Sequence, residues 1–178
     1  MSISRACDAA GRAETDTMLS HEKLLSLVAD NYVAIAPDLI GPLLNLLSLS
    51  REACGGDMDK FLIMVVVAIR TTAHKDFANY TQEQLHSGEM PVFPSLGINI
   101  QSIADSVGAP KETVRRKVVE LVEAGWIERR GNDLFYTARA WQGLSAVGKQ
   151  LEVTAVSYYE TVAALAARAV KAPAPAKR

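Results

Sequence analysis

Apolar residues recur at three- and four-residue steps over most of this chain, which is the spacing of one face of a helix. The first set that follows it is Leu24, Leu27, Val28 and Tyr32. A second helix is predicted to begin at Pro37 and Asp38, because proline fits a first turn and an acidic side chain suits the positive helix end. Its buried side would consist of Leu43, Leu44, Leu46, Leu47 and Leu49.

The glycine pair Gly55 and Gly56 is expected to end the second helix. Asp57 or Asp59 can then cap a third helix through "KFLIMVVVAIRTTAHKDFA". The β-branched residues of that stretch would also suit a buried strand, but its length favours a helix. The acids of "GGDMD" could alternatively belong to a metal or phosphate site, although a helix break followed by capping acids explains them without a ligand. We therefore predict that residues 17–80 form an N-terminal helical region for dimerisation or signal sensing.

Two segments lack a helical period. Residues 1–16 are small and polar, and we expect a disordered leader there. Residues 81–96 contain one glycine and two prolines, and they are expected to form a connecting loop.

The helical period returns in residues 138–170 and predicts one long amphipathic helix. Its apolar stripe is longer than a domain of this size needs for its own core, so we expect the helix to hold a homodimer together. The stripe consists of Leu144, Leu151, Ala155, Tyr158, Val162 and Leu165. Packing against the N-terminal helices of the same chain is the alternative. Prolines in "KAPAPAKR" would stop the helix, so residues 171–178 are expected to be disordered.

Residues 97–137 combine two short helices with a hairpin. Asn99 can cap the helix "IQSIADSV", and Gly108 supplies the backbone freedom for a sharp turn. A second helix from Pro110 to Ala124 follows, and Gly125 ends it. Its inward stripe consists of Val114, Val118, Leu121 and Val122.

The runs "WIERR" and "LFYT" then predict two short strands around the turn Gly131-Asn132-Asp133. A helix, a glycine turn and a helix form the supersecondary unit typical of DNA binding, and the hairpin would be its wing. The predicted fold class is therefore mainly α with a small β-wing, a winged helix-turn-helix within a helical frame.

Composition narrows the picture without deciding it. The 178 residues are 49% apolar, which suits a soluble globular chain, and the net charge of −1 carries no whole-chain signature of nucleic-acid binding. The charge is −5 in residues 1–96, zero in 97–137 and +4 in 138–178. Within the predicted second helix of the DNA-binding unit the cations come first and Glu120 and Glu123 come last.

Other classes of function find little support. The longest strictly apolar run, Phe61–Ile69, is about half the length of a membrane span, and the N-terminus lacks the apolar core of a signal peptide, so we expect a cytoplasmic protein without a membrane partner. Cys7 and Cys54 lack C-x-x-C spacing, and the three histidines lack metal-ligand spacing. No nucleophile comes with a recognisable histidine partner, and no glycine loop suits a phosphate. We expect no metal, no cofactor and no enzymatic activity.

The stretch "SIADSVGAPKETVRRKVVELVEAGWI" resembles the helix-turn-helix of the cyclic-AMP receptor protein family of bacterial transcription regulators, and more broadly winged helix-turn-helix regulators. The resemblance covers Ile98 to Thr137. It implies that Lys111, Glu112 and Arg116 reach base edges. Pro110 stands where that family usually has serine or threonine, and residues 17–80 have a helical period where it has a β-roll, so cyclic-nucleotide binding is not implied.

The chemistry of these side chains agrees with that assignment. An arginine can bridge guanine O6 and N7, a glutamate can accept a hydrogen bond from cytosine N4, and only the first turns of a recognition helix enter the major groove deeply. Lys111, Glu112 and Arg116 are placed for base contacts. The cations that flank the same turns or the wing turn are expected to contact phosphates. They are Arg115, Lys117, Arg129 and Arg130.

Two functions from different classes remain open. The first is a sequence-specific transcriptional regulator that binds double-stranded DNA as a homodimer, and its helical frame could enclose a small-molecule effector, in a layout similar to the multiple-antibiotic-resistance-regulator type. The second is a winged-helix module that docks another protein and binds DNA weakly or not at all. The cations at the front of the recognition helix favour the first, and the zero net charge of residues 97–137 favours the second.

Overall fold

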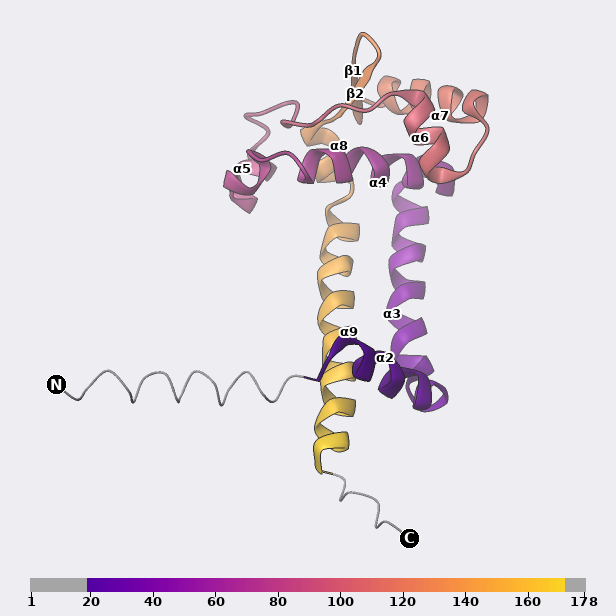
Figure 1. Ribbon diagram of the computed structural model, residues 1–178. Helices are drawn as coiled ribbons and strands as arrows, with labels where there is room; N and C mark the ends of the chain where they lie inside the picture. Colours follow the sequence, from indigo (N-terminus) through magenta and orange to yellow (C-terminus); the bar gives the residue numbers. More distant parts are fainter. Residues whose placement is uncertain (1–18, 172–178) are drawn as a thin grey trace, which may run out of the picture. The chain divides into compact units, whose positions relative to one another are not determined.

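The computed structural model describes residues 19–171 (Figure 1). It is mainly helical and contains one small antiparallel sheet of two strands, in agreement with the coarse fold class expected. The expected leader at residues 1–16 and the tail from residue 172 lie outside the described residues. The chain divides into two units, one formed by Met1–Pro42 with Val153–Arg178 and the other by Leu43–Glu152.

The first unit contains α2 (His21–Asp30), the start of α3 (Tyr32–Ala53) and most of α9 (Ser145–Lys171). The Ser20 side chain caps α2 by accepting a hydrogen bond from the Lys23 backbone N–H. α3 begins at Tyr32, five residues before the predicted start at Pro37, and it keeps Pro37 and Pro42 in its interior. Each proline removes one helical hydrogen bond, but the apolar residues on both sides continue the helix.

α3 also has the length and composition of a membrane-crossing helix. It has 22 residues, and its most apolar stretch has a mean hydropathy of 1.5. Its sequence contains no long uninterrupted apolar run, because Asp38, Asn45 and small polar residues interrupt it. Only 11% of that stretch is buried, so α3 presents a largely unpartnered apolar surface.

The second unit is built around α4 (Met58–Thr72). Asp57 caps this helix, since its Oδ1 accepts a hydrogen bond from the Lys60 backbone N–H at 3.2 Å. The capping interpretation of "GGDMD" and the helical interpretation of the β-branched run are therefore confirmed, but the helix ends at Thr72, six residues before the predicted end at Ala78. Ile63, Met64 and Val67 of α4 are almost completely buried and lie at the centre of the core.

Around α4 lie α6 (Ile100–Val107), α7 (Lys111–Glu123) and a hairpin of β1 (Ile127–Arg130) and β2 (Asp133–Tyr136) (Figure 1). The strands pair from Ile127 opposite Tyr136 to Arg130 opposite Asp133. The extended segment at Ile98 lies beside β2, where the Leu134 N–H donates to the carbonyl of Ile98 at 2.9 Å.

The expected connecting loop at 81–96 contains a helix that sequence reasoning did not find, α5 (Gln82–Ser87). Thr81 and Gln84 form a reciprocal capping box at its start, and Gly88 ends it with a φ of +75°. Six residues are too few to show a helical period, although threonine followed three residues later by glutamine is a start signal. A short 3-10 helix, η2 (Phe77–Asn79), precedes α5.

The expected single C-terminal helix is two helices, α8 (Ala138–Gly143) and α9, separated at Leu144. Leu144 has φ −100° and ψ 11°, outside helical geometry, although its N–H still donates to the Ala140 carbonyl at 2.9 Å. Because apolar spacing continues unchanged through the break, the pattern could not reveal it.

Candidate nucleic-acid interface

α6 and α7 are joined by a short turn, and hydrogen bonds and dihedral angles of neighbouring residues fix its geometry. Asn99 caps α6, with its Oδ1 accepting from the Ser102 N–H at 2.9 Å, and Gly108 ends α6 with a φ of +67°. The N–H of Ala109 then donates to the carbonyl of Ala104 at 3.2 Å. Pro110 directly precedes α7 and supplies no side-chain cap. The sequence predicted these helices to within a residue at each end.

One side of α7 is core and the other is surface. Val114, Val118 and Leu121 are at most 3% exposed, as the predicted inward stripe requires. The opposite side is exposed and carries Lys111, Glu112, Arg115, Arg116 and Val119. Four of these five side chains are charged, and all four lie in the first two turns, so this half of the helix presents charged groups to solvent.

Glu112 and Arg115 form a two-pronged ion pair on this exposed side. The Arg115 Nε donates to Glu112 Oε2 at 2.9 Å, and Nη2 donates to Oε1 at 2.6 Å. The hydrogen bond from Arg115 holds the pKa of the Glu112 carboxyl below its usual range, and the same bond raises the pKa of Arg115. Both groups are charged, but each is already engaged by the other.

Lys111 and Arg116 lie on the same side of α7 but, unlike Glu112 and Arg115, they are not paired with each other. Within residues 19–171, neither side chain makes a hydrogen bond or an ion pair, and both are exposed. A guanidinium without a partner in its own chain can form two hydrogen bonds with guanine or with a phosphate, and no ion pair within the chain has to break first. Arg116 is therefore the best-placed cation on α7 for direct contact with a ligand.

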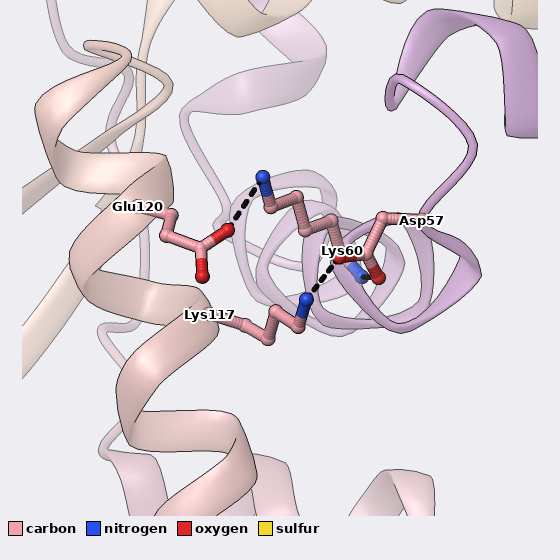
Figure 2. Close-up of polar contacts among 4 residues, drawn as sticks. All are labelled: Asp57, Lys60, Lys117 and Glu120. Atoms are coloured by element: carbon pink, nitrogen blue, oxygen red, sulfur yellow. Dashed lines mark hydrogen bonds and ion pairs between the residues drawn. The ribbon is translucent and has the colours of Figure 1, made fainter.

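Lys117 is placed differently from the expectation that it contacts phosphates. Its ammonium group pairs with Asp57 Oδ2, next to α4, and its side chain is 17% exposed (Figure 2). One residue further along a helix turns the side chain by about 100°, so Lys117 lies away from the face that carries Arg116. The contact of Lys117 with a phosphate stays a prediction, and the ion pair with Asp57 gives this side chain a second partner within the chain.

The hairpin carries two more of the predicted residues. The Arg129 Nε donates to the carbonyl of Gly131 at 2.9 Å, which holds the arginine beside the turn. The Arg130 Nε donates to Glu128 Oε1 at 2.7 Å, and its guanidinium carbon lies 5.1 Å from the centre of the Phe135 ring. Both arginines are exposed.

The hairpin is attached to the end of α7 by a threonine and a tryptophan. The Thr137 hydroxyl donates to the carbonyl of Gly125 at 2.8 Å, and Trp126 packs against Gly143 of α8. Phe93 stacks on Tyr136, and Trp141 contacts both rings edge-on. Trp126 is thus partly buried and belongs to the packing under the hairpin.

Other chemistry is sparse in the part of the chain that the structure describes. No group of three or more histidine, cysteine or acidic residues could hold a metal ion there. Burial raises the pKa of the Cys54 thiol to about 11, so the thiol is protonated and unreactive near neutral pH. A cavity between α4 and α7 has about 20 Å³, enough for one water molecule.

No family model, curated protein or solved structure matches this chain.

Proposed function

We propose that this protein is a sequence-specific DNA-binding transcriptional regulator of the winged helix-turn-helix type, which inserts α7 into the major groove. One observation carries the proposal: the first two turns of α7 present Lys111, Glu112 and Arg116 on the face opposite the buried stripe. A recognition helix needs its inner side in the core and its first turns free for base edges. The hairpin with Arg129 and Arg130 would be the wing that contacts the backbone.

Roles within the interface follow from the internal partners of each side chain. Lys111 and Arg116 have no internal ion pair to break within the described residues, so they are the proposed base-contacting cations. Glu112 would accept from a cytosine amino group while Arg115 moves to a phosphate, and this exchange separates their ion pair. Arg115, Arg129 and Arg130 are the proposed phosphate contacts, and Lys117 is removed from that set.

The proposed regulator is a homodimer. One recognition helix reads only a few base pairs, and two-fold symmetry on a palindromic site is the common way to reach genomic selectivity. Support comes from the apolar surface of α3, where Val33, Ile40 and Leu47 lie seven residues apart and are 91%, 53% and 42% exposed. A seven-residue apolar repeat is typical of a helix that packs along another helix.

A protein-docking module is the second candidate function. The observation that favours it is the pairing of Arg115, Lys117 and Arg130 with acidic side chains, which leaves the local field weaker than the count of cations indicates. Selection of bound duplexes from a random DNA library separates the two candidates. Enrichment of a common, palindromic motif over successive rounds supports the regulator, and a bound pool without any common motif refutes it in favour of the docking module.

A further inference from the structure

Two ion pairs join α4 to α7 inside the second unit (Figure 2). Lys117 pairs with Asp57, and the Lys60 Nζ lies 2.7 Å from Glu120 Oε2. The side chains of Asp57 and Lys117 are 21% and 17% exposed, while those of Lys60 and Glu120 are 26% and 37% exposed. All four charges therefore lie at the edge of the packed surface between the two helices.

The order of the charges is opposite on the two helices. On α4 the acid Asp57 comes three residues before the base Lys60, and on α7 the base Lys117 comes three residues before the acid Glu120. A shift of α7 by one turn would bring Asp57 against Glu120 or Lys60 against Lys117. Such like-charge contacts are unfavourable. The two ion pairs thus favour one register of α7 on α4 and disfavour the registers one turn away. The apolar stripe alone does not distinguish these registers.

Asp57 also belongs to the start of α4. Its Oδ1 caps the helix and its Oδ2 holds Lys117, so one carboxylate joins the beginning of α4 to the middle of α7. The residues directly before it, Gly55 and Gly56, have φ values of +63° and +90° and form the turn between α3 and α4. A carboxylate fixed at this turn is therefore in direct contact with the helix proposed to read DNA.

We infer that Asp57 and Lys60 are positioning residues for α7, which act through Lys117 and Glu120 to set the orientation in which its exposed face meets DNA. This inference rests on the proposed function. It assigns Lys117 a structural role and removes it from phosphate binding. Loss of either pair should lower discrimination between DNA sequences, because a tilted helix keeps nearby phosphates but misplaces its base-contacting side chains.

The second ion pair offers a clean test, because neither residue caps a helix. Lys60→Glu and Glu120→Lys each place like charges opposite one another, and the double variant restores opposite charges. We expect each single variant to reduce the ratio of dissociation constants for scrambled and selected duplexes by about tenfold, and the double variant to recover it to within about twofold. Asp59→Asn is the matched control, since Asp59 is exposed on the same helix and makes no ion pair within the described residues. Unchanged discrimination in folded single variants, or no recovery in the folded double variant, overturns the inference.

Lys117 gives a second and independent test. A lysine that neutralises one phosphate contributes about 0.9 to the slope of log affinity against log salt concentration. Lys117→Met should leave that slope unchanged and should reduce discrimination between the duplexes. Asp57→Asn should have the same two effects, and its asparagine keeps a capping side chain at the start of α4. A slope reduced by about 0.9 in Lys117→Met would show a phosphate contact and overturn the inference.

Hydrogen exchange without DNA separates failure of this inference from failure of the proposed function. If the wild-type protein does not discriminate between duplexes, the proposed function is wrong, and the positioning role is judged by the amides of α7 alone. Lys60→Glu and Glu120→Lys should each accelerate the hydrogen exchange of the α7 amides about fivefold. The double variant should return these amides to the wild-type exchange rate. Equal exchange in wild type and both single variants would overturn the positioning role.

Discussion

The hydroxyl group of Tyr158 in α9 donates a hydrogen bond to the carbonyl of Leu39 in α3 at 3.0 Å. Tyr158 belongs to the apolar stripe that was expected to form the dimer seam, so part of this stripe is used within the chain. Leu165 of the same stripe is only 6% exposed. Another side of α9 remains open, where Val156 and Tyr159 are 56% and 73% exposed.

This placement moves the predicted dimer surface to the exposed apolar residues of α3 and α9. We expect light scattering at micromolar concentration to give twice the chain mass of 19.2 kDa. The double variant Ile40→Glu with Val156→Glu should give the monomer mass, because an unpaired buried charge is costly. Leu96→Glu, an equally exposed apolar residue outside this surface, should leave the dimer intact. A monomeric wild type, with and without DNA, would refute the dimer, and its flotation with lipid vesicles would assign the α3 surface to a membrane.

The Asp57–Lys117 pair predicts how stability depends on pH. Burial raises the pKa of Asp57, but hydrogen bonds from Lys117 and the Lys60 backbone outweigh it and lower the pKa below the usual 3.8. The stabilisation is thus complete above pH 3.8 and lost as the pH falls through the lowered value. The Lys117 pKa is raised above 10.5, chiefly by the hydrogen bond to Asp57, so its contribution disappears only as the pH rises through that raised value.

Asp57→Asn keeps a capping side chain and removes the charge. Urea unfolding should show this variant less stable than wild type by a constant amount between about pH 5 and pH 9, with the difference shrinking toward zero below pH 3.8. A difference that stays constant down to about pH 2 would show that the Asp57 carboxylate does not stabilise the fold through its charge.

Two exposed glycines near the α8–α9 break should respond to alanine with opposite signs. A Cβ at Gly143 would lie 2.9 Å from Cζ2 of Trp126, too close for the packed ring, whereas a Cβ at Gly148 would meet nothing within 4 Å. Gly148→Ala should raise the free energy of unfolding by about 0.5–1 kcal/mol, the usual gain in a helix. Gly143→Ala should lower it by about 1 kcal/mol or more. Changes of the same sign in thermal or urea unfolding would contradict the packing of Trp126 on α8.

Features determined by neighbouring residues could be predicted from the sequence, and features determined by distant residues could not. The Gly108 turn, the cap at Asp57 and the stripe of Val114 and Val118 depend on local spacing and local hydrogen bonds. The pairing of Lys117 with Asp57 joins residues 60 positions apart, and nothing in one sequence indicates which acid faces which base. The break at Leu144 could not be predicted, because the apolar spacing continues unchanged through it.

Arg116 and Arg130 should separate sequence reading from positioning on DNA. Arg116→Ala should cost about 1–3 kcal/mol on the selected duplex and relax the preference at one base pair, because a bidentate base contact is lost. Arg130→Ala should weaken binding to all duplexes to a similar extent and reduce the salt slope by about 0.9. The check is a competition assay over all single-base variants of the selected site. An unchanged preference profile with unchanged affinity would remove Arg116 from the base-contacting residues.

The proposal that α7 reads DNA is tested most directly by fluorescence anisotropy of the wild-type protein with the selected duplex and with a scrambled duplex of the same composition. The measurement is repeated at several salt concentrations. We predict at least about a thousandfold tighter binding to the selected duplex at physiological salt. Affinity for both duplexes should fall as salt rises, because the cations of α7 and the hairpin release counterions from phosphates. Equal affinity for the two duplexes at every salt concentration would contradict the account.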